Sequence, residues 1–209
     1  MKFRYLAPLI TAAGLTISSV AAAQGTASRA DLHDGMRRLW EDHVTWTRLF
    51  IVSAVAGLPD IKFTTERLLK NQDDIGAAVA AYYGSDAGAK LTALLRTHIS
   101  TAGELVMAAK AADQAKTADA KKRWYANADD IAAFLAAANP NHWPLVAMKS
   151  AMKTHLDQTL DEATHRIQGD YAADINDYQH IVTHILAMAD ILSDGIVAQF
   201  PQKMAARQR

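Results

Sequence analysis

Four histidines have the spacing that a metal site inside a helical bundle would require. His43, His98, His155 and His184 each fall near the middle of a different long helix that the sequence predicts. The midpoints of helices in an antiparallel bundle lie at about the same height, so the four imidazoles could meet in one layer. Neutral imidazole is the commonest metal ligand among protein side chains. The spacing therefore predicts a site for one transition metal ion, with these four histidines as ligands.

Other side chains on the same helices could support or replace these ligands. Carboxylates and amides orient a ligating imidazole through its second nitrogen, and four side chains are spaced to do so: Asp42, Gln158, Glu162 and Asp177. Alternative ligands are Met152, His180 and Met188. Thioethers with imidazoles favour copper, whereas imidazoles with a carboxylate favour zinc or iron. We therefore expect copper or zinc as the metal.

The hydrophobic pattern predicts the helices that would position these residues. Apolar residues recur at intervals of three and four, and capping residues, Gly or Pro mark the ends. Long helices are expected over residues 31–56, 86–112, 144–168 and 171–199, and shorter ones over 66–70, 75–83 and 118–138. The sequence thus predicts an all-α fold, an antiparallel four-helix-type bundle with additional short helices, over residues 31–200.

The turn at Gly169 provides a check on the register of the last two helices. Residues equally far from a tight turn should be level in the two arms of a helical hairpin. His155 lies 14 residues before Gly169, and His184 lies 15 after it. Glu162 and Asp177 are placed in the same way, 7 before and 8 after. Each pair should therefore be level wherever the helix ends lie.

Patterns typical of other helical-bundle sites are incomplete. A ferritin-like di-iron centre needs two Glu-x-x-His motifs, and the chain has one, Glu162-x-x-His165. A b-type haem with His/His or His/Met ligation stays open. Cys is absent, which excludes thiolate metal sites, covalent haem attachment and disulfides. No Gly-x-Ser-x-Gly, phosphate-binding loop or His-Glu-x-x-His motif supports a hydrolase.

The first residues predict export. Lys2 and Arg4 precede an apolar stretch over residues 6–23 that ends with Ala21 and Ala23, the pattern of a secretory signal peptide. We expect cleavage near Ala23 and a periplasmic or extracellular protein. Flexible tails are expected over residues 24–30 and 201–209.

Charge and hydropathy narrow the choice of partners. Lys+Arg and Asp+Glu number 22 each, and no basic tract suggests nucleic-acid binding. The apolar run over residues 49–58 is too short to span a bilayer. We therefore expect no transmembrane segment after the signal peptide. The run at 49–58 instead predicts a buried helix end or a contact in a homo-oligomer.

Several short sequences carry a resemblance to other proteins. They are Trp40-Glu-Asp-His43-Val-Thr-Trp46-Thr-Arg48, Leu58-Pro-Asp60, Arg67-Leu-Leu-Lys-Asn71, Asp74-Ile-Gly76, Tyr83-Gly84, Trp124-Tyr-Ala-Asn127 and Asp194-Gly-Ile-Val-Ala-Gln-Phe-Pro201. Together they resemble an uncharacterised family of exported bacterial helical-bundle proteins, over about residues 36–203. Some members are labelled glycosyltransferase or acetylglutamate kinase, but this sequence has no nucleotide-binding loop to support either label. The resemblance implies a common fold and brings no catalytic residues.

The leading hypothesis is non-enzymatic binding of a copper or zinc ion by the four histidines. The alternative is a structural or interaction protein, in which the histidines are hydrogen-bonded core groups and residues 49–58 form a partner surface. A second alternative is a redox protein that uses iron or haem. Stoichiometric metal separates the first two hypotheses, and a visible absorption band marks the third.

Overall fold

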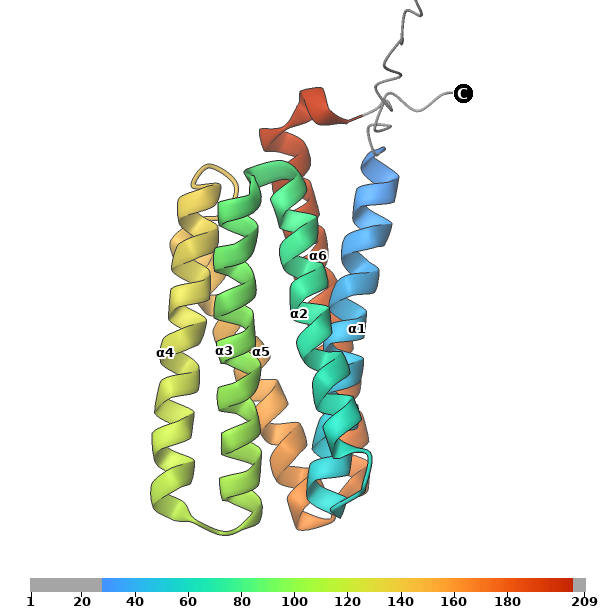
Figure 1. Ribbon diagram of the computed structural model, residues 1–209, viewed down its shortest axis with the longest axis vertical. Coiled ribbons are helices and arrows are strands. Elements are labelled where there is room, and N and C mark those ends of the chain that lie inside the picture. Colours follow the sequence, from blue (N-terminus) through green and yellow to red (C-terminus); the bar gives the residue numbers. More distant parts are fainter. Residues whose placement is uncertain (1–27, 205–209) are drawn as a thin grey trace, which may run out of the picture.

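The computed structural model describes residues 28–204, which form six long helices and one short 3-10 turn (Figure 1). The helices are α1 (Arg29–Ala56), α2 (Ile61–Tyr83), α3 (Ser85–Lys110), α4 (Gln114–Ala138), α5 (Leu145–Gln168) and α6 (Tyr171–Gln199), followed by η1 (Pro201–Lys203). Within residues 28–204 there is no strand. The predicted signal peptide at residues 1–23 lies outside the described residues, as do residues 24–27 and 205–209.

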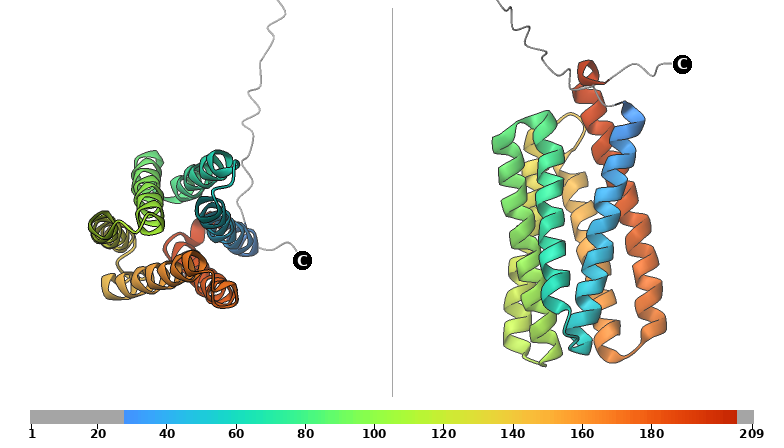
Figure 2. Two further views of the ribbon diagram at one scale, coloured as in Figure 1. Left: turned by 90° about the horizontal axis from the view of Figure 1, so that it is seen from below. Right: turned by 45° about the vertical axis from the view of Figure 1, so that its right-hand side comes forward.

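The helices form a ring in chain order. Each helix packs against the next one, and α1 also packs against α6, which closes the ring (Figure 2). α1, α3 and α5 additionally contact one another across the interior. The predicted all-α bundle with additional helices is confirmed. The additional helices α2 and α4 are long, with 23 and 25 residues, and complete the ring.

α2 is one continuous helix, where the sequence predicted two short ones. The expected caps of the two short helices, Thr64 or Thr65 and Asp73 or Asp74, all lie inside α2. The Thr65 hydroxyl donates to the Ile61 carbonyl at 2.7 Å. Asp73 accepts from Arg96 of α3 at 3.0 Å. Side chains that favour helix starts are also tolerated inside a helix. A hydroxyl can donate to a carbonyl one turn earlier in its own helix, and a carboxylate can pair with a cation on a neighbouring helix. The break expected between residues 70 and 75 is therefore wrong.

The other helix ends follow from capping. α1 begins at Arg29, two residues before the predicted start, because Ser28 and Asp31 form a capping box in which each side chain accepts from the other's backbone N–H. Gly57 and Gly169 end α1 and α5 in the left-handed conformation, with φ of 68° and 78°. Asp170 caps α6 by accepting from the Ala173 N–H at 3.1 Å. The predicted turn at Gly169 is confirmed.

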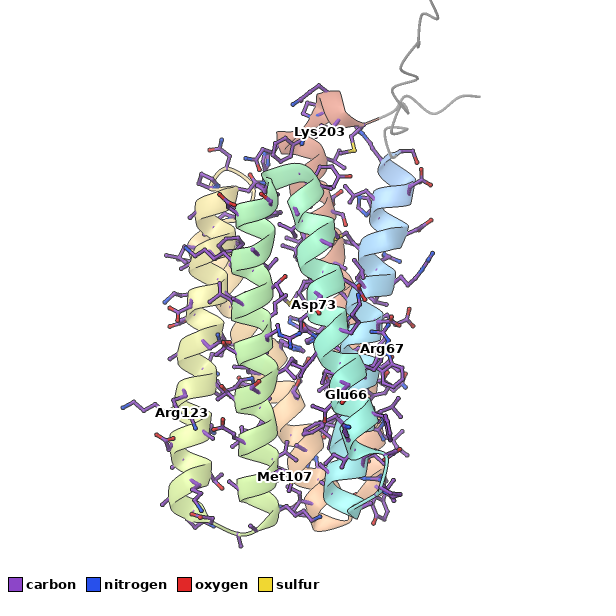
Figure 3. All side chains as sticks on the ribbon, in the orientation of Figure 1. Glu66, Arg67, Asp73, Met107, Arg123 and Lys203 are labelled. Atoms are coloured by element: carbon purple, nitrogen blue, oxygen red, sulfur yellow. The ribbon has the colours of Figure 1, made fainter. Side chains whose placement is uncertain are left out.

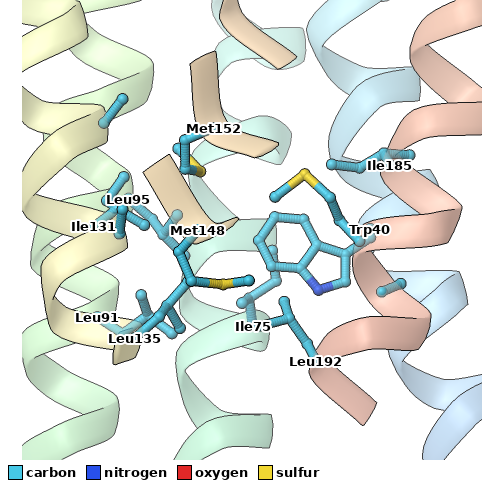
Figure 4. Packing of buried hydrophobic residues seen from close by; sticks show 14 of the residues in the cluster. Trp40, Ile75, Leu91, Leu95, Ile131, Leu135, Met148, Met152, Ile185 and Leu192 are labelled. Atoms are coloured by element: carbon cyan, nitrogen blue, oxygen red, sulfur yellow. The ribbon is translucent and has the colours of Figure 1, made fainter. Parts of the chain in front are cut away.

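The core fills the interior of the ring along most of its length. Trp40 of α1, Met152 of α5 and Ile185 of α6 come together inside it (Figure 4). Buried aromatic and aliphatic side chains each contribute about 1.5–3 kcal/mol. The apolar run at 49–58 contributes Ile51 and Ala54 to this interior, both 1% exposed. The use of that run as a subunit contact stays a prediction.

α6 is the most apolar of the helices. Among the described residues it alone has the length and composition to cross a membrane, since one stretch of 18 residues within it has a mean hydropathy of 1.6. Half of that window is buried within the bundle. The core helix of a soluble bundle has the same properties.

Ion pairs link neighbouring helices on the outside of the ring. Arg67 of α2 donates to Asp42 of α1 at 2.8 Å, and Arg123 of α4 donates to Glu104 of α3 at 2.6 Å. Arg67 and Arg123 lie on the outer surface (Figure 3). Such exposed pairs contribute at most about 1 kcal/mol each. These ion pairs therefore contribute more to the choice of which helices are neighbours than to the free energy of unfolding.

The loop between α4 and α5 is anchored by Trp143, which is 1% exposed. Its indole Nε1 donates to the Ile191 carbonyl at 3.2 Å. The ring lies so close to Gly195 of α6 that a Cβ added there would sit 2.1 Å from Trp143 Nε1. Only glycine permits this approach.

We predict that Gly195→Ala destabilises the protein by about 1–3 kcal/mol, because the new methyl group must displace the buried indole. Gly35→Ala is the matched control, since a Cβ at Gly35 meets nothing within 4 Å and alanine favours a helix by about 0.5–1 kcal/mol. Urea unfolding measures both. Equal stability of the two variants would contradict the packing described.

Candidate histidine site

The four predicted histidines meet in one layer, as the sequence predicts. The ring centroid of His155 lies 5.8 Å from that of His43, 6.5 Å from that of His98 and 6.5 Å from that of His184. They come from α1, α3, α5 and α6, and His155 is the central member. His43, His98 and His155 are 3–5% exposed, and His184 is half-buried. The predicted register of the α5–α6 hairpin is thereby confirmed.

His98 uses both of its ring nitrogens within the protein. Trp124 Nε1 donates to His98 Nε2 at 3.0 Å, and His98 Nδ1 lies 2.9 Å from Asn127 Oδ1. An indole N–H only donates, so Nε2 must be the unprotonated acceptor and Nδ1 must carry the proton. Asn127 Nδ2 donates to the Leu94 carbonyl at 3.2 Å, which orients the amide oxygen toward His98. His98 is therefore a neutral imidazole with no nitrogen left for a metal.

His43 and His155 are different, because the Nδ1 atom of each is buried without a hydrogen-bond partner. Trp40 Nε1 and Gln72 Oε1 are also buried and unpartnered. More than 90% of buried polar groups in proteins are paired, so several orphaned atoms around one layer are unusual. Such atoms call for an explanation, for which a water molecule or an ion in the layer is the simplest.

A cavity of about 20 Å³ lies beside these atoms. His43, His98 and His155 line it together with the thioether side chains Met36, Met152 and Met188. A volume of that size is enough for about one water-sized occupant. Imidazole and thioether side chains thus line the same cavity.

Burial keeps the imidazoles neutral. It lowers the pKa of His43 to about 4, against the opposing effect of the Gln72 and Asn71 amides. Burial, and then the charge of His43, lower the pKa of His98 to about 3. The pKa of His155 lies well below its ordinary value through burial and its three histidine neighbours. Neutral imidazole is the form that binds a metal.

His184 connects the layer to the edge of the bundle. Its Nε2 lies 3.0 Å from the Ala151 carbonyl oxygen. A carbonyl only accepts, so Nε2 carries the proton and Nδ1 has a free lone pair. His184 is therefore able to accept a hydrogen bond or to coordinate through Nδ1.

The carboxylates predicted to support the histidines are engaged elsewhere. Glu162 accepts from Arg48 at 2.7 Å, and Asp177 lies 2.6 Å from His165. Asp42 of α1 pairs with Arg67. His180 is exposed. The structure therefore does not bring Glu162, Asp177 or His180 into the layer.

Amides from α2 and α4 take the place that the sequence assigned to carboxylates. Asn71 and Gln72 are fully buried, and Asn127 is 7% exposed. The sequence alone assigned no role to these three amides. For Asn71 and Gln72 the reason is that two short helices were expected in place of α2, whereas Asn127 lies on α4 and is recognised only from its contact with His98. A continuous helix over 61–83 would have placed Asn71 and Gln72 on the stripe of Leu68 and Ile75. Gln158 retains its predicted place three residues after His155, with a buried and unpartnered Oε1.

A second buried polar cluster joins α1, α5 and α6 toward the Gly169 turn. Arg48 donates to Glu162 and to Asp174, both at 2.7 Å, and Arg166 donates to Asp174 at 3.2 Å. Glu162 and Asp174 are at most 1% exposed. Burial raises the pKa of Glu162 to about 7, although Arg48 opposes this. The two arginines balance the two carboxylates, so the cluster is a closed ion network.

The geometry also bears on the iron alternatives. The Glu-x-x-His carboxylate at Glu162 is held by Arg48, which leaves the di-iron pattern incomplete. A haem would need far more room than a cavity of about 20 Å³ provides. Among residues 28–204, no three His, Asp or Glu side chains are positioned to hold a metal ion as they stand. The other donor side chains that line the cavity are the thioethers of Met36, Met152 and Met188.

Comparisons of the chain with protein-family models, curated proteins and solved structures find no match. The resemblance to exported helical-bundle proteins stays a prediction. Function must therefore be argued from the site itself.

We predict that acid destabilises the protein through the histidine layer. The pKa values of His43 and His98 in the folded state lie below the unfolded value of 6.5, so the unfolded chain binds more protons as the pH falls below 6.5. Stability should fall with pH in that window, by about 1.4 kcal/mol per pH unit for each histidine. The pKa of Glu162 is raised from 4.5 to about 7 in the folded state, so between pH 7 and 4.5 the folded chain binds this proton more than the unfolded chain does. Glu162 therefore adds stability as the pH falls and offsets the effect of one histidine in that range. Urea unfolding from pH 7.5 to 4.5 measures the net slope.

His43→Gln should reduce this slope, whereas His180→Gln, at an exposed position, should not change it. Constant stability of the parent protein between pH 6.5 and 4.5 would show that the imidazoles are not held neutral.

We predict that Arg48→Met costs about 3–5 kcal/mol, because it leaves Glu162 buried without a counter-charge. Arg123→Met is the control: its partners Glu104 and Asp119 are exposed, so the loss should stay below about 1 kcal/mol. Thermal and urea unfolding compare the two. Similar losses would mean that the Arg48 network does not act as a buried ion cluster.

Proposed function

We propose that this protein binds a single soft transition metal ion, copper(I) first, inside the bundle. The ligands are Nδ1 of His43, Nδ1 of His155 and the thioethers of Met152 and Met188. The observation that carries the proposal is two buried, unpartnered imidazole nitrogens beside a cavity lined by thioethers. The four-histidine site expected from the sequence is thus narrowed to a mixed nitrogen and sulfur site.

The spacing of His43 and His155 supports this. Two imidazoles that bind one ion have ring centres about 5–6 Å apart, because metal–nitrogen bonds are about 2 Å long. Their centroids are 5.8 Å apart.

The chemistry of the layer favours a singly charged, soft ion. Thioethers with imidazoles select copper(I) among the common metals. Glu162 and Asp177 pair with Arg48 and His165, so no carboxylate of the predicted set offsets charge there. Burying a doubly charged ion without a counter-charge is costly. Zinc, the second metal expected from the sequence, is therefore the weaker candidate.

His98 and His184 have separate roles in this proposal. His98 packs parallel to His155, with an interplanar angle of 25° and both nitrogens satisfied, so it positions His155 without binding the ion. His184 also packs against His155, at an interplanar angle of 16°. Its Nδ1 makes it a further candidate ligand, as is the thioether of Met36, which lines the cavity. Export, which residues 1–23 predict, would place this site in the periplasm or outside the cell.

The structural alternative is favoured by a specific observation. The Trp124–His98–Asn127 hydrogen bonds satisfy His98 completely, which is the behaviour of a core histidine. In that function the layer only specifies helix register, and no ion binds.

Anaerobic titration of untagged protein with copper(I), against a chromophoric chelator, tests the proposal. We expect about one bound equivalent and, by X-ray absorption, both nitrogen and sulfur neighbours. Met152→Leu/Met188→Leu conserves volume and should weaken binding at least about tenfold, the loss typical even of residues that only orient a ligand.

Met148→Leu is the matched control, because Met148 is buried on α5 but does not line the cavity. Binding without sulfur neighbours, or equal binding by the double variant, would contradict the mixed site. The absence of any retained copper would favour the structural function.

A further inference from the structure

A groove on the outside of the bundle adjoins the cavity beside the histidine layer. It runs between α4 and α5 and has a volume of about 490 Å³. Its walls come from residues 125–129 of α4 and residues 149–153 of α5. Ala126 and Ser150 line it and are exposed. The groove is therefore open to solvent along the seam between the two helices.

Met152 forms the wall between this groove and the interior. Among the described residues it alone lines both the groove and the cavity of about 20 Å³. It is 6% exposed, so its side chain closes the interior off in the structure. Methionine has three rotatable side-chain bonds and fills irregular spaces adaptably. A flexible side chain that is also a proposed copper ligand thus borders both spaces.

The two seams next to the groove are closed at the height of the layer. Between α3 and α4, Trp124 Nε1 donates to His98 at 3.0 Å. Between α5 and α6, His184 Nε2 donates to the Ala151 carbonyl at 3.0 Å. An ion that passed through either seam would have to displace one of these hydrogen bonds.

The other side of the layer also offers no path for a metal ion. A cavity of about 40 Å³ lies there between α1, α3 and α5, with walls that include Phe50, Leu105 and Ala163. No imidazole, thioether or carboxylate lines this apolar cavity. An ion would lose its ligands there without gaining new ones, which is costly in an apolar space.

The α4–α5 seam is held at the two ends of the groove. Lys149 of α5 pairs with Asp129 of α4 at 3.0 Å, and both side chains are exposed. Toward the other end, the Tyr125 hydroxyl donates to Asp157 at 2.6 Å. An exposed ion pair contributes at most about 1 kcal/mol. The end of the groove at Lys149 is therefore weakly held.

The size of the groove indicates what could deliver the ion. Small-molecule sites have volumes of about 300–1,000 Å³, and the groove lies within that range. Copper(I) passes between ligands by exchange, and a thioether is one of the soft ligands that it prefers. A small copper(I) chelate in the groove would therefore meet the Met152 side chain.

We propose that copper(I) enters and leaves the bundle through this groove, delivered by a small chelate, and that Met152 is the first protein ligand it meets. The inference rests on the copper(I) function proposed above. Access to Met152 from the groove does not itself depend on metal, so it can be measured separately.

Oxidation of metal-free protein by hydrogen peroxide, followed by peptide mass spectrometry, tests this access. Peroxide transfers one oxygen atom to the thioether sulfur and leaves as water. Met152 should react at least about fivefold faster than Met148, since susceptibility follows exposure to the reagent. Met148 is the matched reference, because it is buried on the same helix and lines neither the groove nor the cavity.

Ala126→Phe/Ser150→Phe covers the groove from two exposed positions. Oxidation of Met152 should slow about tenfold in this variant, because access then requires a local opening of the bundle. Thr154→Phe is the control, since Thr154 is exposed on α5 outside the groove. It should leave the oxidation rate unchanged. Thermal unfolding checks that the substitutions preserve the fold.

Stopped-flow mixing with copper(I), supplied as its acetonitrile complex, tests the route. The double variant should slow both uptake and release about tenfold, as an added barrier of that size does in each direction. Its affinity for copper(I) should stay that of the parent, and Thr154→Phe should exchange copper(I) at the parent's rate.

Equal oxidation of Met152 and Met148 would overturn the proposal. Bound copper(I) with unchanged exchange rates in the double variant would contradict the route alone. A parent protein that binds no copper(I) would contradict the proposed function and the route with it.

Discussion

The fold depends on keeping a layer of imidazoles neutral in the middle of an apolar core. An uncharged imidazole can be buried if its N–H finds an acceptor, whereas an imidazolium without a counter-ion is too costly. His98 meets this condition completely, because Trp124 donates to Nε2 and Asn127 accepts from Nδ1. Those bonds join α3 to α4 and leave His98 as a fixed wall against which His155 packs.

The inward position of α1, α3 and α5 follows from the same layer. These three helices contact one another across the ring, and each contributes one of the fully buried imidazoles. The layer divides the interior into a compartment rich in thioethers and an apolar compartment. Trp124 belongs to both sides, since its Nε1 holds His98 while its ring lines the apolar cavity. Trp124 thus links the histidine layer to the apolar cavity.

The all-α fold and the meeting of the four histidines were predictable, because both depend on helix periodicity and on a turn that Gly169 marks unambiguously. α2 was not predictable in the same way. Its Thr65 and Asp73 are good capping residues, and only their bonds to Ile61 and Arg96 make them neutral to the helix. Glu162 pairs with Arg48 of α1, and the two residues are 114 positions apart in the sequence. No local sequence pattern predicts that pairing. Hydrogen-bond partners such as Trp124 for His98 likewise emerge only from packing.

Long-range proton–nitrogen NMR of the imidazole rings, recorded on metal-free protein at pH 6, tests the central claim most directly. The two nitrogen shifts of each ring report its protonation state and its tautomer. The structure predicts that His43, His98 and His155 are all neutral at that pH, with the proton of His98 on Nδ1. An imidazolium at any of these three positions, or a proton on Nε2 of His98, would contradict the account.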